Sequence, residues 1–141
     1  MFVALLAGFC LVFSMVGGIS LSPLPIVIDY VIPGSAAGWR MVHLGMMMNG
    51  MMALLLGCVL DRCDATDRSA ALVGWGTIIA VWGNFCFYLF GMFAPNHGVS
   101  LQDNPLGAAN WAGTLAFFPA LIGAITLMMA VIVLLRSNKA P

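Results

Sequence analysis

The chain has 141 residues, of which 62% are hydrophobic and 7% are charged, and its formal net charge at pH 7 is zero. Soluble domains carry about 25% charged residues, so this composition excludes a water-soluble fold and indicates an integral membrane protein. The neutral charge and the lack of any basic run exclude nucleic acid as an expected partner.

Four long apolar runs predict four transmembrane helices, at about 2–21, 36–60, 70–93 and 111–135. The first run lacks a basic n-region and exceeds a normal signal-peptide core, so we expect a retained helix. Short connections between the runs favour an all-α, four-transmembrane-helix up-down bundle that forms a single integral membrane domain over 1–141. Pro119 lies inside the fourth run, where we expect a kink or a locally re-satisfied backbone.

The connections carry turn signals and most of the charge. Pro33-Gly34 predicts a turn, and Ser35 is a plausible N-cap for the second helix. One side of the predicted bundle holds the N-terminus, the 61–69 loop and the tail, with Arg62, Arg68, Arg136 and Lys139, whereas the other side holds only Arg40. The positive-inside rule therefore predicts both termini in the cytoplasm. We also expect the protein to lie in a bacterial inner membrane, surrounded by membrane lipid.

The second run carries two polar side chains at membrane depth, His43 and Asn49. An intramembrane polar residue is a functional-site hypothesis, because burying it in hydrocarbon is costly. On a helix the two positions lie roughly 120° apart around the axis and about 9 Å apart along it. We therefore expect the two side chains to point in different directions.

His43 is the candidate metal ligand, because neutral imidazole is the commonest protein metal ligand. No second histidine lies nearby, and a site with one imidazole and an open position suits a haem, whose porphyrin supplies four donors. A hydrogen bond from His43 to a neighbouring carbonyl is an equally weighted alternative. Arg40, one turn earlier, either reaches lipid headgroups or pairs with a porphyrin propionate.

The other candidate ligands are methionines and cysteines. Methionines surround the second helix at positions 41, 46, 47, 48, 51 and 52. Thioethers bind Cu(I), but they also fill irregular apolar gaps, and packing is the favoured interpretation. Cys10, Cys58, Cys63 and Cys86 form no CxxC motif, which argues against a disulfide framework, a zinc site and c-type haem.

Asn84 and Tyr88 in the third run are four residues apart and share one helix face. Both polar tips need partners at membrane depth. They form either a structural hydrogen bond between helices or a polar patch in a pocket, with Tyr88 as a donor to a bound oxygen. His97 and Asp103 in the next loop are expected to be solvated, and Trp75 and Trp82 to face lipid or neighbours.

A series of short motifs resembles the styrene oxide isomerase family. They are Pro33-Gly34-Ser35, Gly38-Trp39, His43, Gly45, Asn49-Gly50-Met51-Met52, Trp82, Asn84, Phe87-Tyr88, Phe90, Phe93, Pro95-Asn96 and Gly98. The resemblance runs from about 31 to 124, nearly without gaps. Each dipeptide is a weak signal, and the combined spacing carries the specificity.

The resemblance implies a membrane homotrimer that holds haem b between subunits and isomerises aryl epoxides such as styrene oxide to aldehydes. It implies that His43 is the axial iron ligand and that Asn49 and Tyr88 are catalytic residues facing the substrate oxygen, and we expect Arg40 and Asn84 beside the cofactor. Ferric haem would act as a Lewis acid, and a 1,2-hydride shift would form the carbonyl. A haem between subunits would let His43 reach outward while Asn49 faces the pocket of its own bundle.

Two other functions remain open from the residues themselves. A non-catalytic haem protein, either an electron carrier or a sensor, would need a second strong axial ligand, for which a neighbour's methionine is available. A Cu(I) transporter would use the methionine-rich helix with Cys58 and Cys86, but it would leave Asn49, Asn84 and Tyr88 without a role.

Overall fold

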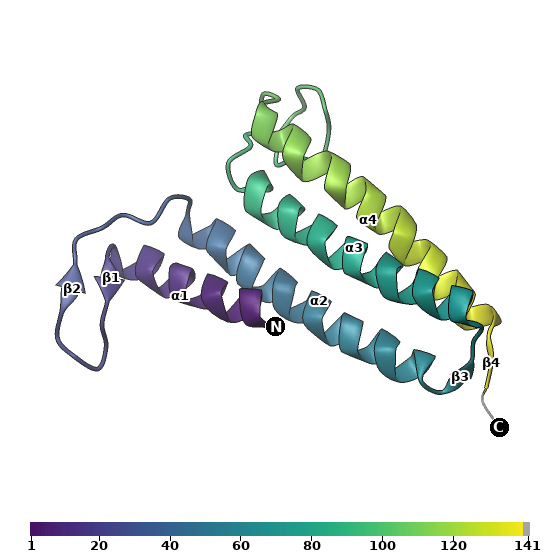
Figure 1. Cartoon of the computed structure of the whole chain (residues 1–141). Coiled ribbons are helices and arrows are strands. Elements are labelled where there is room, and N and C mark those ends of the chain that lie inside the picture. Colours follow the sequence, from purple (N-terminus) through teal and green to yellow (C-terminus); the bar gives the residue numbers. More distant parts are fainter. Residues whose placement is uncertain (140–141) are drawn as a thin grey trace.

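The computed structural model describes residues 1–139 and contains four helices that run alternately up and down (Figure 1). They are α1 (Phe2–Val16), α2 (Ala36–Leu60), α3 (Asp67–Gly91) and α4 (Trp111–Arg136). Two short antiparallel strand pairs accompany them: β1 (Ile19–Ser20) with β2 (Val27–Ile28), and β3 (Cys63–Asp64) with β4 (Asn138–Lys139). The predicted all-α class is confirmed, and α2 has the predicted bounds.

Side-chain caps begin the three long helices. The Ser35 hydroxyl accepts a hydrogen bond from the Gly38 amide at 3.0 Å, which confirms the predicted cap of α2. Thr66 caps α3 and Asn110 caps α4 in the same way. These caps satisfy amides that have no partner inside a helix. The Thr66 cap also explains why α3 begins at Asp67, three residues before the predicted start.

The first helix is shorter than the predicted span 2–21. It ends at Val16, because Gly17 takes a left-handed conformation with φ of 79° and its amide bonds back to the Phe13 carbonyl. The apolar residues that follow enter the β1–β2 pair instead. A helix of 15 residues is about 22 Å long, against about 30 Å for a bilayer core. By length and composition, α2, α3 and α4 are the helices that can cross a membrane.

Packing between the helices follows chain order: α1 lies on α2, α2 on α3, and α3 on α4 (Figure 1). One buried cluster joins the first three helices around Ala4, Ala7, Val42 and Met46. A second cluster lies around Val73, Ala130 and Leu134, close to the turn between α2 and α3. Only 17% of the residues in the most apolar stretch of α4 are buried within the chain, so most of its residues remain at least partly accessible to lipid or other chains.

Helices α3 and α4 approach closely because small residues line their contact. A β-carbon at Gly83 would overlap the Pro119 carbonyl, and one at Gly76 would lie 2.9 Å from the Thr126 carbonyl oxygen. Helix α4 continues through Pro119 without a break. Small residues that let backbones approach are the usual means of helix association in membranes.

We expect Gly83→Ala to destabilise the fold by about 1–3 kcal/mol, because the added methyl meets backbone that has no room to move. Reversible unfolding in detergent, followed by circular dichroism, measures this loss. Gly74→Ala in the same helix is the matched control, since a β-carbon there would meet nothing within 4 Å. Equal stability of the two variants would contradict the close α3–α4 contact.

Candidate functional site

The His43 side chain points from α2 toward α1. Its Nδ1 lies 2.7 Å from the Ala4 carbonyl oxygen, and a carbonyl can only accept, so Nδ1 carries the proton and donates. The Nε2 atom then keeps its lone pair. A metal-binding histidine usually has this arrangement, with one ring nitrogen anchored and the other free to bind.

Gly8 of α1 lies against the same imidazole ring. A β-carbon at this position would be 3.0 Å from Nδ1 and 3.1 Å from Cε1 of His43. Ala4 and Gly8 are one helical turn apart, so one face of α1 supplies both the hydrogen-bond acceptor and the space for the ring. The ring itself is only partly buried.

The Asn49 side chain points from α2 toward α3 and is 5% exposed. Its Nδ2 donates to the Gly45 carbonyl at 2.8 Å, and its Oδ1 accepts from Asn84 Nδ2 at 2.8 Å. The prediction that His43 and Asn49 point in two directions is therefore confirmed. The Asn49–Asn84 bond is also the interhelical hydrogen bond that we weighed as the structural alternative for Asn84.

Tyr88 lies one turn after Asn84, and its ring packs against Gly45 in the α1–α2–α3 cluster. A β-carbon at Gly45 would overlap three ring atoms of Tyr88. Among the described residues 1–139, every buried side-chain nitrogen or oxygen atom has a hydrogen-bond partner, so the Tyr88 hydroxyl is not an unsatisfied buried group. Asn49 and Tyr88 thus both contact Gly45, and Asn84 bonds to Asn49, on a different side of α2 from the His43–Ala4 bond.

The remaining predicted residues lie apart from this centre. Arg40 is exposed near the start of α2. His97 and Asp103 are exposed in the loop between α3 and α4, as expected. The Asp103 carboxylate accepts a hydrogen bond from the Ala109 amide at 2.8 Å, so it helps to order that loop.

The methionines of α2 diverge around the helix. Met46 is 3% exposed in the core and Met47 packs beside it, whereas Met41, Met48 and Met51 are about half exposed. Cys58 is exposed near the end of α2. In the part of the chain that the structure describes, three or more His, Cys, Asp or Glu side chains nowhere gather into a metal cluster.

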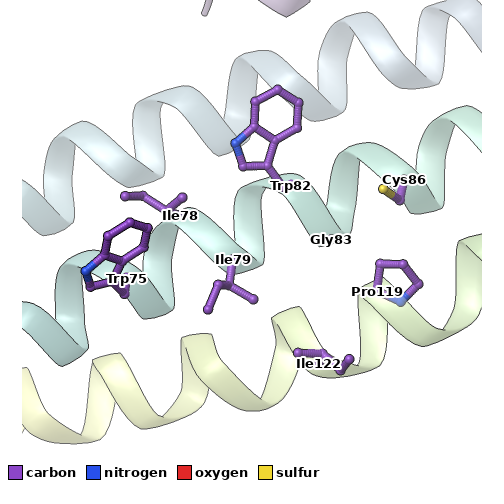
Figure 2. A pocket seen from close by; sticks show the side chains of 8 residues that line it. All are labelled: Trp75, Ile78, Ile79, Trp82, Gly83, Cys86, Pro119 and Ile122. Atoms are coloured by element: carbon purple, nitrogen blue, oxygen red, sulfur yellow. The ribbon is translucent and has the colours of Figure 1, made fainter.

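Two of the apolar pockets in the described part of the chain are of a size to hold a small molecule, and neither has His43, Asn49 or Tyr88 in its wall. The first, of about 350 Å³, lies on α3 and α4 between Trp75, Trp82 and Pro119 (Figure 2). Both tryptophans are more than half exposed there, in agreement with the predicted lipid-facing or neighbour-facing positions. The second, of about 340 Å³, lies between the start of α2 and the end of α3 and has His97 in its wall.

Sequence reasoning missed Ala4 and Gly8 as residues of the site, and it noted Gly45 only as part of the family resemblance, not as a contact of Tyr88. Ala4 contributes a backbone carbonyl, so its side-chain type gives no signal. The two glycines matter for the side chain that they lack, and a lone glycine in an apolar helix does not indicate which neighbour occupies its space.

A single imidazole with a shielded Nδ1 is a poor site for a bare ion, which needs several protein donors. It fits a group that brings its own equatorial donors and needs one axial nitrogen from the protein. The residues present at His43 therefore fit a haem. Arg40 is the cation nearest to His43 along α2 and is available for a carboxylate of such a group.

Comparison with known proteins gives a consistent result. The family model described as styrene oxide isomerase matches residues 1–138. A curated relative, the styrene-oxide isomerase of Pseudomonas fluorescens, is 33% identical over 133 residues, which cover 94% of this chain and 78% of the relative. The match extends well beyond the 31–124 region in which the motifs were noted.

We expect the Asn49–Asn84 bond to couple α2 to α3 by about 0.5–2 kcal/mol, the usual range for a hydrogen bond between membrane helices. A double-mutant cycle with Asn49→Leu and Asn84→Leu, measured by unfolding in detergent, isolates this energy. The control cycle pairs Asn49→Leu with Thr77→Val, because Thr77 bonds within its own helix to the Val73 carbonyl. A coupling no larger than that of the control would mean that the bond adds nothing to stability.

Proposed function

The chain belongs to the styrene oxide isomerase family and is an isomerase that converts an epoxide to an aldehyde, and on this basis we propose that its substrate is an aryl epoxide and its cofactor haem b. The observation that carries the proposal is the His43–Ala4 hydrogen bond, which leaves Nε2 as the free lone pair of the ring. An imidazole prepared in this way suits an axial iron ligand.

Haem would be held by His43 through the iron, and we assign Arg40 to a haem propionate because it is the exposed cation one turn before His43. When bound, ferric haem would supply a Lewis acid for the epoxide oxygen. His43 keeps the Nδ1 proton on its Ala4 bond throughout, so the imidazole acts as a ligand and takes no part in proton transfer.

Because Tyr88 and Asn49 lie on a different side of α2 from His43, they would orient the oxygen of an epoxide at a haem held by a neighbouring subunit, and would stabilise the negative charge that develops on that oxygen. The Tyr88 hydroxyl is a donor, and Asn49 retains one N–H beyond the one given to Gly45. Donors held in place before the reaction stabilise developing charge without reorganising. The Asn84 Nδ2 donates to the Asn49 Oδ1, so in this proposal Asn84 is a positioning residue for Asn49. The second amide hydrogen and the Oδ1 of Asn84 remain available to the cofactor.

The reaction is an internal rearrangement. The benzylic C–O bond breaks, positive charge builds on the carbon beside the aromatic ring, and a hydride moves from the neighbouring carbon as the carbonyl forms. Every atom and electron of the epoxide is retained in the aldehyde, so no oxidant, reductant or water is consumed. A dry apolar environment suits this reaction, because water would trap the cation as a diol.

We further propose a homotrimer in a bacterial inner membrane, with haem at the subunit interface and the C-terminus on the cytoplasmic side. The predicted cytoplasmic N-terminus additionally requires that the short helix α1 cross the membrane. The wide apolar surface left uncovered by the chain supports an assembly or a lipid environment. Charged residues at the β3–β4 end, including Arg62, Arg68 and Arg136, support the orientation. The divergent methionines of α2 favour packing over copper transport, and membership of an isomerase family disfavours a non-catalytic haem carrier.

We expect His43→Ala to lose both the haem and the isomerase activity. The absorption spectrum of the purified protein should lose its Soret band, and aldehyde formation from styrene oxide should fall to background. His97→Ala is the matched control, because His97 is the only other histidine and is exposed in a loop. Full activity of the His43 variant would remove this residue, and with it the proposed haem site, from the mechanism.

We expect Tyr88→Phe to keep the haem but to lower kcat by roughly 10²–10³-fold, as the loss of one oxyanion donor does in other enzymes. Steady-state aldehyde formation measures kcat, and the Soret band reports haem content in the same sample. Tyr30→Phe, the other tyrosine and an exposed one, is the control. A Tyr88 variant as fast as the parent would show that its hydroxyl does not touch the reacting oxygen.

A further inference from the structure

We infer that α1 is a positioning element for His43, in which the Ala4 carbonyl holds the imidazole proton on Nδ1 and the missing side chain of Gly8 makes room for the ring. The inference rests on the proposed function for its purpose, which is to present Nε2 to an iron. The geometry that supports it belongs to the chain itself and needs no bound group.

The Ala4 carbonyl is a protected acceptor. Ala4 is 1% exposed in the cluster between α1 and α2, so water does not compete for its oxygen. The Nδ1 atom lies 2.7 Å from that oxygen, which is a short N–H···O distance. Breaking this bond would leave the N–H of a partly buried imidazole without its partner, which costs free energy. The tautomer with the proton on Nε2 is therefore disfavoured.

Gly8 is the residue that allows this bond to form. Gly8 follows Ala4 by four residues, so in an α-helix the Gly8 amide bonds to the Ala4 carbonyl. Position 8 must therefore stay helical for this turn of α1 to be complete. A β-carbon there would lie 3.0 Å from Nδ1, the atom that donates to Ala4. A side chain at position 8 therefore requires the imidazole ring to shift, and the shift displaces the atom that makes the Ala4 bond.

The hydrogen bond to Ala4 and the packing against Gly8 both come from α1, so they restrain the imidazole from one side only. His43 is partly buried, and its ring meets α1 through Nδ1 and Cε1. Of the two ring nitrogens, Nε2 is the one that α1 leaves without a partner. Residues that orient a metal-binding histidine typically change metal affinity by about 10–100-fold when they are altered.

The test uses the purified full-length chain with Gly8→Ala and Gly8→Val, which form a graded series. Gly57→Ala and Gly57→Val on α2 are the matched controls, because a β-carbon at Gly57 would meet nothing within 4 Å. All variants carry His97→Gln, so that His43 gives the only imidazole signals. The first measurement is the ¹⁵N chemical shift of Nδ1 and Nε2 in protein made without haem, which reports the tautomer directly.

The second measurement is haem affinity, from titration of the same proteins followed at the Soret band. We expect the parent and the Gly57 variants to hold the proton on Nδ1. Gly8→Ala should mix the two tautomers, and Gly8→Val should do so further, with haem affinity lower by about 10–100-fold than in the Gly57 controls.

Each outcome decides one question. A tautomer that is the same in the Gly8 and Gly57 variants would overturn the positioning role of α1, whether or not haem binds. A tautomer that changes in the Gly8 variants supports that role, and if the parent then takes up no haem, only the proposed function fails. A changed tautomer with haem affinity within about twofold of the controls would overturn the purpose that we assign to the bond. If the valine variant does not fold, the comparison of Gly8→Ala with Gly57→Ala still tests the inference.

Discussion

The structure depends on the requirement that a polar group in an apolar helix find a hydrogen-bond partner. Helix α2 carries two such groups, and each one joins α2 to a different helix. His43 bonds to the Ala4 carbonyl of α1, and Asn49 bonds to Asn84 of α3. The polar residues that serve the proposed chemistry are therefore also the residues whose hydrogen bonds join the first three helices. Helix α2 therefore links the proposed chemistry to the packing of the helices, and a change in α1 or α3 also changes the position of the site residues.

Glycine makes these contacts possible by what it lacks. Gly8 leaves space for the imidazole, Gly45 leaves space for the Tyr88 ring, and Gly83 lets α4 approach α3. Water is scarce between such helices, so the approach gains little from hydrophobic burial and depends on close packing and interhelical hydrogen bonds. A helix rich in glycine usually gives up some stability. In this protein the glycines leave the space that bulky polar and aromatic side chains need between closely packed helices.

Much of this arrangement was predictable from the sequence, because periodicity and caps act locally. The bounds of α2 and the Ser35 cap follow from the apolar run and its turn signal, and the divergence of His43 and Asn49 follows from helix geometry. The length of α1 was predicted wrongly, since hydropathy does not register that Gly17 and Gly18 end a helix inside an apolar run. The partner of His43 was not predictable in residue terms, because a backbone carbonyl looks the same at every position. Asn84 was foreseen as part of a polar pair, but not as the partner of Asn49.

The amide of Asn49 shows how a fold can prepare a donor before a substrate arrives. Its Nδ2 faces a carbonyl that can only accept, so the orientation of the amide is determined without ambiguity. Its Oδ1 is already occupied by Asn84. Of the four hydrogen-bonding capacities of this side chain, the protein uses one donor and one acceptor and leaves one N–H whose direction the other two bonds define. A donor restrained in this way loses little entropy when charge develops on a nearby oxygen, which is the condition for stabilising a transition state more than a ground state.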